Sequence, residues 1–320
     1  MSETRTLLPV VWHEAYEVDL GPHVYPTAKY RLVLERLLAE GMIAPDQLRR
    51  PAPVSEAQLL LAHDPLYVRT IATGLSRDEE LVLEVPFSPA LRSAALLSAG
   101  GTLLAGRLAR ERGVAVHLGG GFHHAFADHG EGFCLVNDVA IAIRALQREG
   151  AIRRAAVIDC DVHQGNGTAA IFDGDPDVFT LSLHQQYNYP AAKPPSDRDV
   201  GLEDGAGDER YLSLLRRHLP EVFEWHHPDV VFYLAGADPY REDQLGGLGL
   251  TLAGLEQRDA LVLGFAARAR SAVAVTLAGG YARQLADTVE IHCNTVRVAQ
   301  RVLDETGPGY FTRSSRGLGR

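Results

Sequence analysis

Five short, largely apolar runs recur along the chain, each about as long as a β-strand and each separated from the next by a stretch with helical periodicity. They occupy residues 114–118, 155–158, 178–184, 230–235 and 272–277. Apolar runs without polar alternation are typical of strands that are buried on both faces. Their alternation with helices predicts an α/β fold, with a mostly parallel sheet flanked by helices on both faces.

The 320 residues show no internal repeat and no linker, which predicts a single domain over residues 1–306 and a C-terminal tail over residues 307–320. We expect a further strand at residues 8–12. Residues 208–226 have the pattern of one amphipathic helix, whereas residues 185–207, rich in Pro, Gly and charge, predict a long irregular loop.

Composition narrows the functional class. A formal net charge of −10 argues against non-specific binding to nucleic acid or to an anionic membrane. Cys134, Cys160 and Cys293 form no CxxC pair, which favours a reducing compartment. The apolar run at residues 7–12 is too short for a signal-peptide core or a membrane span, so a cytoplasmic protein is expected.

Residues 155–167, AAVIDCDVHQGNG, place three polar side chains at the end of a buried strand: Asp159, Asp161 and His163. Such a cluster is unfavourable unless its charge is compensated, and a metal ion would compensate it. The alternative is a solvated strand end with helix-capping aspartates. Asp238, after the run at residues 230–235, supplies a third ligand beside Asp161 and His163, and three protein ligands with an open position are typical of catalytic zinc.

Other polar groups follow the ends of other predicted strands, where the ligands of open α/β sheets bind. His123 and His124 come after a glycine triplet, and adjacent imidazoles suit acid–base chemistry, although two unrelated loop histidines are the alternative. Tyr281 follows a double glycine and is either an oxyanion donor or a core aromatic residue. Asn166 is either a turn residue or the orienting partner of a histidine.

Seven motifs, in this order, resemble the histone deacetylase superfamily, and most closely its class IV branch. They are GGGFHHA (119–125), GEGFC (130–134), DCDVHQGNGT (159–168), SLH (182–184), GAD (236–238), GGLGLT (246–251) and GGY (279–281). NYP (188–190) and GDERYL (207–212) add to the class IV likeness. The resemblance implies the arginase–deacetylase fold.

The resemblance also implies roles for individual residues. Zn²⁺ would be held by Asp161, His163 and Asp238. His123 would pair with Asp159, His124 would pair with Asn166, which stands where class I members have aspartate, and Tyr281 would stabilise the oxyanion. The substrate would contact Gly132, Phe133, Tyr189, Leu245 and Gly280. A structural K⁺ would lie near Asp159, Asp161, His163, Ser182 and Leu183, and a second near Phe172 and Val178.

The expected activity is hydrolysis of an N-acyl-lysine amide, acetyl or longer, by metal-activated water, with His124 favoured over His123 as the general base. An acetylpolyamine or other small N-acyl amine is an alternative substrate. A non-hydrolytic acyl-lysine binding module is a rival from another class. A two-metal ureohydrolase is a third possibility, but it needs more carboxylates than one DxDxH and one GAD motif provide.

Overall fold

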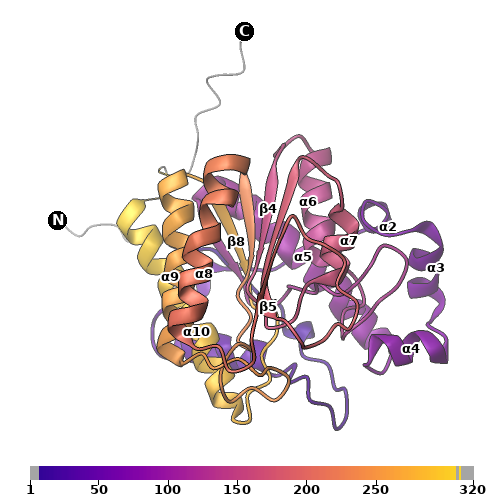
Figure 1. Cartoon of the computed structure of the whole chain (residues 1–320). Helices are drawn as coiled ribbons and strands as arrows, with labels where there is room; N and C mark the ends of the chain where they lie inside the picture. Colours follow the sequence, from indigo (N-terminus) through magenta and orange to yellow (C-terminus); the bar gives the residue numbers. More distant parts are fainter. Residues whose placement is uncertain (1–6, 308–309, 311–320) are drawn as a thin grey trace.

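The computed structural model describes residues 7–307 and residue 310, so nearly all of the expected tail lies outside the described residues. One sheet of eight strands, all parallel, forms the centre of the molecule (Figure 1). Its strands are β1 (Val10–Val11), β2 (Leu48–Arg49), β3 (Val114–His117), β4 (Ala155–Asp159), β5 (Val178–Gln185), β6 (Arg198–Leu202), β7 (Val230–Leu234) and β8 (Ala272–Thr276). The predicted α/β fold is confirmed.

Helices cover both faces of the sheet. The helices are α1 (Lys29–Ala39), α2 (Glu56–Leu59), α3 (Pro65–Thr73), α4 (Arg77–Leu83), α5 (Pro89–Arg112), α6 (Asp138–Arg148), α7 (Asn166–Phe172), α8 (Asp208–Pro220), α9 (Leu252–Ala269) and α10 (Leu285–Thr306). Figure 1 shows α8, α9 and α10 on one face and α5, α6 and α7 on the other, while α2 to α4 lie at the outer side of the second layer. None of the helices that the structure describes has the length and apolar character needed to span a bilayer.

The strand order across the sheet is β2-β1-β3-β8-β7-β4-β5-β6. The central strands β3, β4, β7 and β8 are buried along their whole length, which explains why their sequences are apolar up to the last residue. These four strands are neighbours in the sheet although they come from distant parts of the chain. Because all of them are parallel, the loops at their carboxyl ends meet at one edge, which is where we expected the functional residues.

Three elements differ from the sequence-based expectation. The strand expected at residues 8–12 pairs only over Val10–Val11. The edge strand β6 lies inside the segment expected to be irregular, where residues 198–202 alternate between exposed and buried side chains. The helix expected over residues 208–226 ends at Pro220, which has no N–H to donate, and continues as a π-helical turn over Glu221–His226.

Candidate active site

Two carboxylates and one imidazole converge at the carboxyl ends of β4 and β7. Asp161 and His163 follow β4, Asp238 follows β7, and the two strands are paired. His163 Nδ1 lies 3.0 Å from Asp161 Oδ1 and 3.5 Å from Asp238 Oδ2. All three residues are buried, and their ligand atoms lie within 4.8 Å of one another. The structure therefore brings together the three residues expected to bind a metal.

The backbone aims these oxygens inward. The Gly279 N–H donates to Asp161 Oδ2 at 2.8 Å, and the Val162 N–H donates to Asp238 Oδ1 at 2.9 Å. Asp238 Oδ2 is buried and has no hydrogen-bond partner among the described residues. A Cβ on Gly279 would lie only 1.9 Å from this oxygen, so the glycine leaves the space beside the cluster open.

The cluster holds protons that a cation would replace. Burial raises the pKa of Asp238 to about 7, with the charge of Asp161 adding to the effect. Burial lowers the pKa of His163, but contacts with Asp161 and Asp238 outweigh it and raise the pKa to about 10. Since metal ligands bind in their deprotonated forms, a divalent cation would displace these protons and compensate the buried negative charge.

Next to the cluster, each of two adjacent histidines has its own partner. His123 Nδ1 lies 2.6 Å from Asp159 Oδ2, and His124 Nδ1 lies 2.7 Å from Asn166 Oδ1. The two Nε2 atoms are 3.1 Å apart, so one ring must donate to the other. Both histidines are thus paired with the residues named from the sequence.

The electrostatic environment separates the two imidazoles. Burial lowers the pKa of His123, but Asp159 and Asp161 outweigh burial and raise the pKa to about 9. Burial also lowers the pKa of His124, and the charges of His123 and His163 push it further down, well below the usual value. The two pKa shifts run in opposite directions and favour a charged His123 beside a neutral His124.

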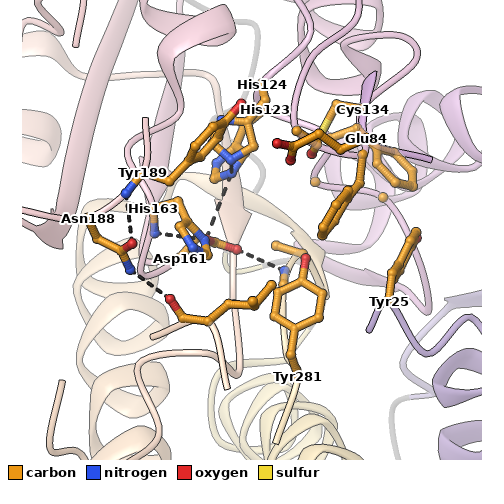
Figure 2. A pocket seen from close by; sticks show the side chains of 18 of the residues that line it. Tyr25, Glu84, His123, His124, Cys134, Asp161, His163, Asn188, Tyr189 and Tyr281 are labelled. Atoms are coloured by element: carbon orange, nitrogen blue, oxygen red, sulfur yellow. Dashed lines mark hydrogen bonds and ion pairs between the residues drawn. The ribbon is translucent and has the colours of Figure 1, made fainter. Parts of the chain in front are cut away.

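These residues lie at a cavity of about 240 Å³. Figure 2 shows His163 and Asp161 on the same side of the view as Tyr189, with Tyr25 on the opposite side. The lining includes the expected residues Gly132, Phe133, Tyr189, Leu245 and Tyr281. Gly280 is not part of the lining, whereas the neighbouring Gly279 is.

Aromatic rings form much of the cavity wall. Phe133 stacks on Tyr25, with ring centroids 5.9 Å apart, and meets Tyr281 edge-on at 6.0 Å. Tyr189 meets His124 edge-on at 4.9 Å. The Tyr281 backbone N–H donates to Asp243 Oδ2 at 2.7 Å, which fixes the position from which the phenol enters the cavity.

The structure adds residues that the sequence did not single out. Glu84 lines the cavity and caps α4 in the left-handed conformation, with φ of 59°. Burial raises its pKa, and the charge of Glu131 raises it further. Lys29 is fully buried beneath the site, where its Nζ donates to the Ala278 carbonyl at 2.7 Å. Neither residue belongs to a recognisable motif; an acidic residue closing a short capped helix was the only signal for Glu84.

The residues named for potassium lie near the same strand ends. Asp159 pairs in register with Ser182 across β4 and β5, and Leu183 is the next residue of β5. Ser182 Oγ lies 2.9 Å from His184 Nδ1. Phe172 and Val178, named for a second ion, are both buried at the far end of this region, where α7 ends and β5 begins.

Comparison with known proteins places this geometry in context. A family model described as "Histone deacetylase domain" matches residues 23–296. An uncharacterized protein of Picosynechococcus sp. is 41% identical, over 92% of this chain and 99% of the relative. Histone deacetylase 2 of Arabidopsis thaliana is 31% identical, over 88% of this chain and 77% of the relative.

Two more distant similarities agree with these. Acetoin utilization protein AcuC of Bacillus subtilis is 29% identical, over 76% of this chain and 69% of the relative. The crystal structure of the HDA15 HD domain superposes with a TM-score of 0.75 at 22% identity, covering 93% of this chain and 89% of that chain, and thus shares its fold.

Proposed function

The chain belongs to the histone deacetylase family, and from that premise we propose that it is a zinc-dependent deacylase that removes acetyl or longer acyl groups from the side-chain amine of lysine. The observation that carries the proposal is the convergence of Asp161, His163 and Asp238 at a cavity with aromatic walls, beside two histidines and a tyrosine. A cavity with aromatic walls suits the apolar part of an acyl-lysine side chain.

The donor set fits zinc. One imidazole and two carboxylates leave a position open, which is the pattern of catalytic zinc sites, and Asp238 Oδ2 accepts no hydrogen bond from the described residues. Bound zinc would polarise the amide carbonyl and lower the pKa of water. Among the residues that the structure describes, this is the one cluster of His, Cys, Asp or Glu close enough to hold a metal, which does not favour a two-metal ureohydrolase.

The protein groups would divide the proton transfers among themselves. His124 is neutral and hydrogen-bonded to Asn166 through Nδ1, so its Nε2 lone pair, which accepts from His123 Nε2 when no substrate is bound, would serve as the base that takes a proton from the attacking water. His123, held as a cation by Asp159, stabilises the negative charge that develops nearby. The Tyr281 hydroxyl donates to the carbonyl oxygen as it gains charge, and a protonated histidine returns a proton to the departing amine.

Four finer assignments belong to the same proposal. The catalytic domain is residues 1–306, and the class IV likeness rests on the motifs at residues 119–125 and 159–168. A structural K⁺ beside Asp159 and Ser182 is supported by their pairing in register. A cytoplasmic location is supported by Cys134, Cys160 and Cys293, which are buried and unpaired.

An acetylated polyamine is the second candidate substrate, because the cavity mouth is acidic. Glu84 lines the main cavity, and Glu84 and Glu131 both line a shallower hollow beside it. Two carboxylates at the entrance favour a substrate with a second positive charge. For a peptide substrate, Glu84 would instead accept a backbone N–H at the rim.

The test is release of free amine from zinc-loaded protein. The panel carries acetyl, medium-chain and long-chain acyl groups on lysine peptides, and it includes an acetylated polyamine. Asp161→Ala should abolish turnover, whereas replacement of the exposed Asp46 by alanine should leave it unchanged. Retention of turnover in Asp161→Ala would overturn the metal mechanism. If the protein bound one zinc ion and yet hydrolysed none of the substrates, the deacylase proposal would be refuted and the acyl-lysine binding module favoured.

A further inference from the structure

Glu131 sits on a tight turn at the edge of the cavity. The Glu131 N–H donates to the Cys134 carbonyl at 3.2 Å, and the Cys134 N–H donates back to the Glu131 carbonyl at 2.9 Å. Between them, Gly132 and Phe133 both have positive φ, 52° and 69°, as in a type I′ turn. This turn fixes the backbone from which the Glu131 side chain reaches Asn166, the partner of His124.

One oxygen of Glu131 accepts two hydrogen bonds. Asn166 Nδ2 donates to Glu131 Oε1 at 2.8 Å, and the Tyr189 hydroxyl donates to the same oxygen at 2.7 Å. The other oxygen, Oε2, lies 3.4 Å from His129 Nε2. The carboxylate therefore touches the partner of His124 and a wall of the cavity at the same time.

The first of these bonds determines which way the Asn166 amide points. An ionised carboxylate can only accept hydrogen bonds, so the NH₂ group of Asn166 must face Glu131. The amide oxygen then faces His124, where it lies 2.7 Å from Nδ1. An amide oxygen also only accepts, so the proton of neutral His124 resides on Nδ1 and the lone pair on Nε2. That lone pair is the one a general base needs.

The geometry points to Glu131 as a positioning residue that acts on His124 through the Asn166 amide. It stabilises the Nδ1–H tautomer of His124. It also supplies a negative charge through Asn166, whereas an aspartate at position 166 would place that charge directly beside His124. This role rests on the proposed hydrolytic function for its kinetic consequence, but the tautomer it enforces exists without turnover.

A purely local role for Glu131 at the rim makes different predictions. If the carboxylate only attracted cationic substrates, its loss would raise KM, and loss of the neighbouring exposed Asp128 would do the same. If it only braced the turn, its loss would lower thermal stability. A positioning role instead lowers kcat, because the base is presented in the wrong tautomer for part of the time.

The experiment is a double-mutant cycle between Glu131 and Asn166. Glu131→Gln keeps the size of the side chain and removes the charge. On an acyl-lysine peptide with no second positive charge, we expect kcat to fall roughly 10–100-fold, as when other residues that orient a functional side chain are changed, with KM and Tm nearly unchanged. In an Asn166→Asp background, the new carboxylate faces His124 directly and is repelled by Glu131. There Glu131→Gln should raise kcat, so the sign of its effect reverses.

Asp128→Asn is the control for charge, since it removes a nearby exposed carboxylate whose described hydrogen bond is to His129 rather than to Asn166. Equal losses from Glu131→Gln in both backgrounds, or a change confined to KM, would overturn the positioning role.

A second readout separates this inference from the proposed function. In zinc-loaded protein with ¹⁵N-labelled histidine, NMR should show His124 protonated on Nδ1 in the wild type and a mixture of tautomers in Glu131→Gln. If the wild type turned over none of the acyl panel, the proposed function would fail while the tautomer result still decided the role of Glu131. An unchanged His124 spectrum in Glu131→Gln would refute that role.

Discussion

The protonation of Tyr281 follows from where its ring is held. Burial raises the pKa of its hydroxyl well above the usual value, and the charges of Asp161 and Asp238 raise it further. The phenol therefore stays protonated at neutral pH and can donate a hydrogen bond. Its ring is packed against Tyr25 and Phe133, so the donor is fixed in place before any substrate binds.

Tyr281→Phe tests this role by removing only the hydroxyl. We expect kcat to fall by roughly 10²–10³, the usual loss for one oxyanion donor, with KM and Tm close to wild type because the ring remains. Steady-state kinetics and thermal unfolding provide the measurements. Tyr187→Phe removes a hydroxyl from an exposed ring and serves as the control. Wild-type kcat in Tyr281→Phe would remove the tyrosine from the mechanism.

At this scale, the sequence was enough to predict which residues lie together wherever a residue closely follows a buried strand. Asp161, His163 and Asp238 could be named because adjacent parallel strands bring their carboxyl ends together. Glu84 and Glu131 could not, because each owes its position to a loop conformation with positive φ, at Glu84 itself and at Gly132 and Phe133 beyond Glu131. Such conformations depend on tertiary contacts that composition does not encode.

At the scale of whole elements, the prediction of the sheet succeeded where strands are buried and weakened at its edges. β3, β4, β7 and β8 carry uninterrupted apolar runs, whereas the edge strand β6 alternates and contains two charged residues. At Pro220, the helix that we expected over residues 208–226 changes from an α-helix to a π-helical turn. Edge pairing and helix ends are determined by neighbours, so the sequence pattern identified them less well.

Glycines inside helices show the same limit. Gly100 in α5 and Gly264 in α9 look alike in the sequence, but their surroundings differ. A Cβ on Gly100 would lie 1.8 Å from the backbone oxygen of Ala52, whereas a Cβ on Gly264 would meet nothing closer than Arg268 Nη1, at 3.6 Å. The first glycine permits a close approach between α5 and a neighbouring backbone segment; the second only adds backbone freedom.

Alanine substitution should therefore have opposite effects at the two positions. Gly100→Ala must displace a backbone oxygen and should lower the free energy of unfolding by about 1–3 kcal/mol. Gly264→Ala removes the helix penalty of glycine and should raise the free energy of unfolding by up to about 1 kcal/mol. Urea denaturation of both variants measures the difference, and stabilisation by both alanines would show that α5 does not contact residue 52 as described.

The stability of the whole molecule depends on histidines that are buried outside the site. His63 Nδ1 donates to the Phe126 carbonyl at 2.9 Å and its Nε2 accepts from the Asn137 N–H at 3.1 Å, so it joins the α2–α3 segment to the loop that carries the catalytic histidines. Burial lowers the pKa of His63 to about 4 and that of His117 to about 3. Both side chains are neutral in the folded protein at every pH above these values.

Acid should therefore weaken the fold before most carboxylates titrate. Below about pH 6.5 the unfolded chain binds a proton at each of these histidines while the folded chain does not, so the free energy of unfolding falls as pH falls toward 4, by up to about 1.4 kcal/mol per pH unit and per group. Above pH 6.5 neither form is protonated, and the stabilising contribution is fully present.

The decisive measurement is the slope of unfolding free energy against pH for His63→Gln. The variant should be less stable at pH 7 because two buried hydrogen bonds are disturbed. Its unfolding free energy should nevertheless fall less steeply between pH 6.5 and 4, because one of the two titrating histidines has been removed. A parallel, merely shifted curve for His63→Gln would mean that His63 becomes protonated within the folded protein, which its two fixed partners, one acceptor and one donor, do not permit.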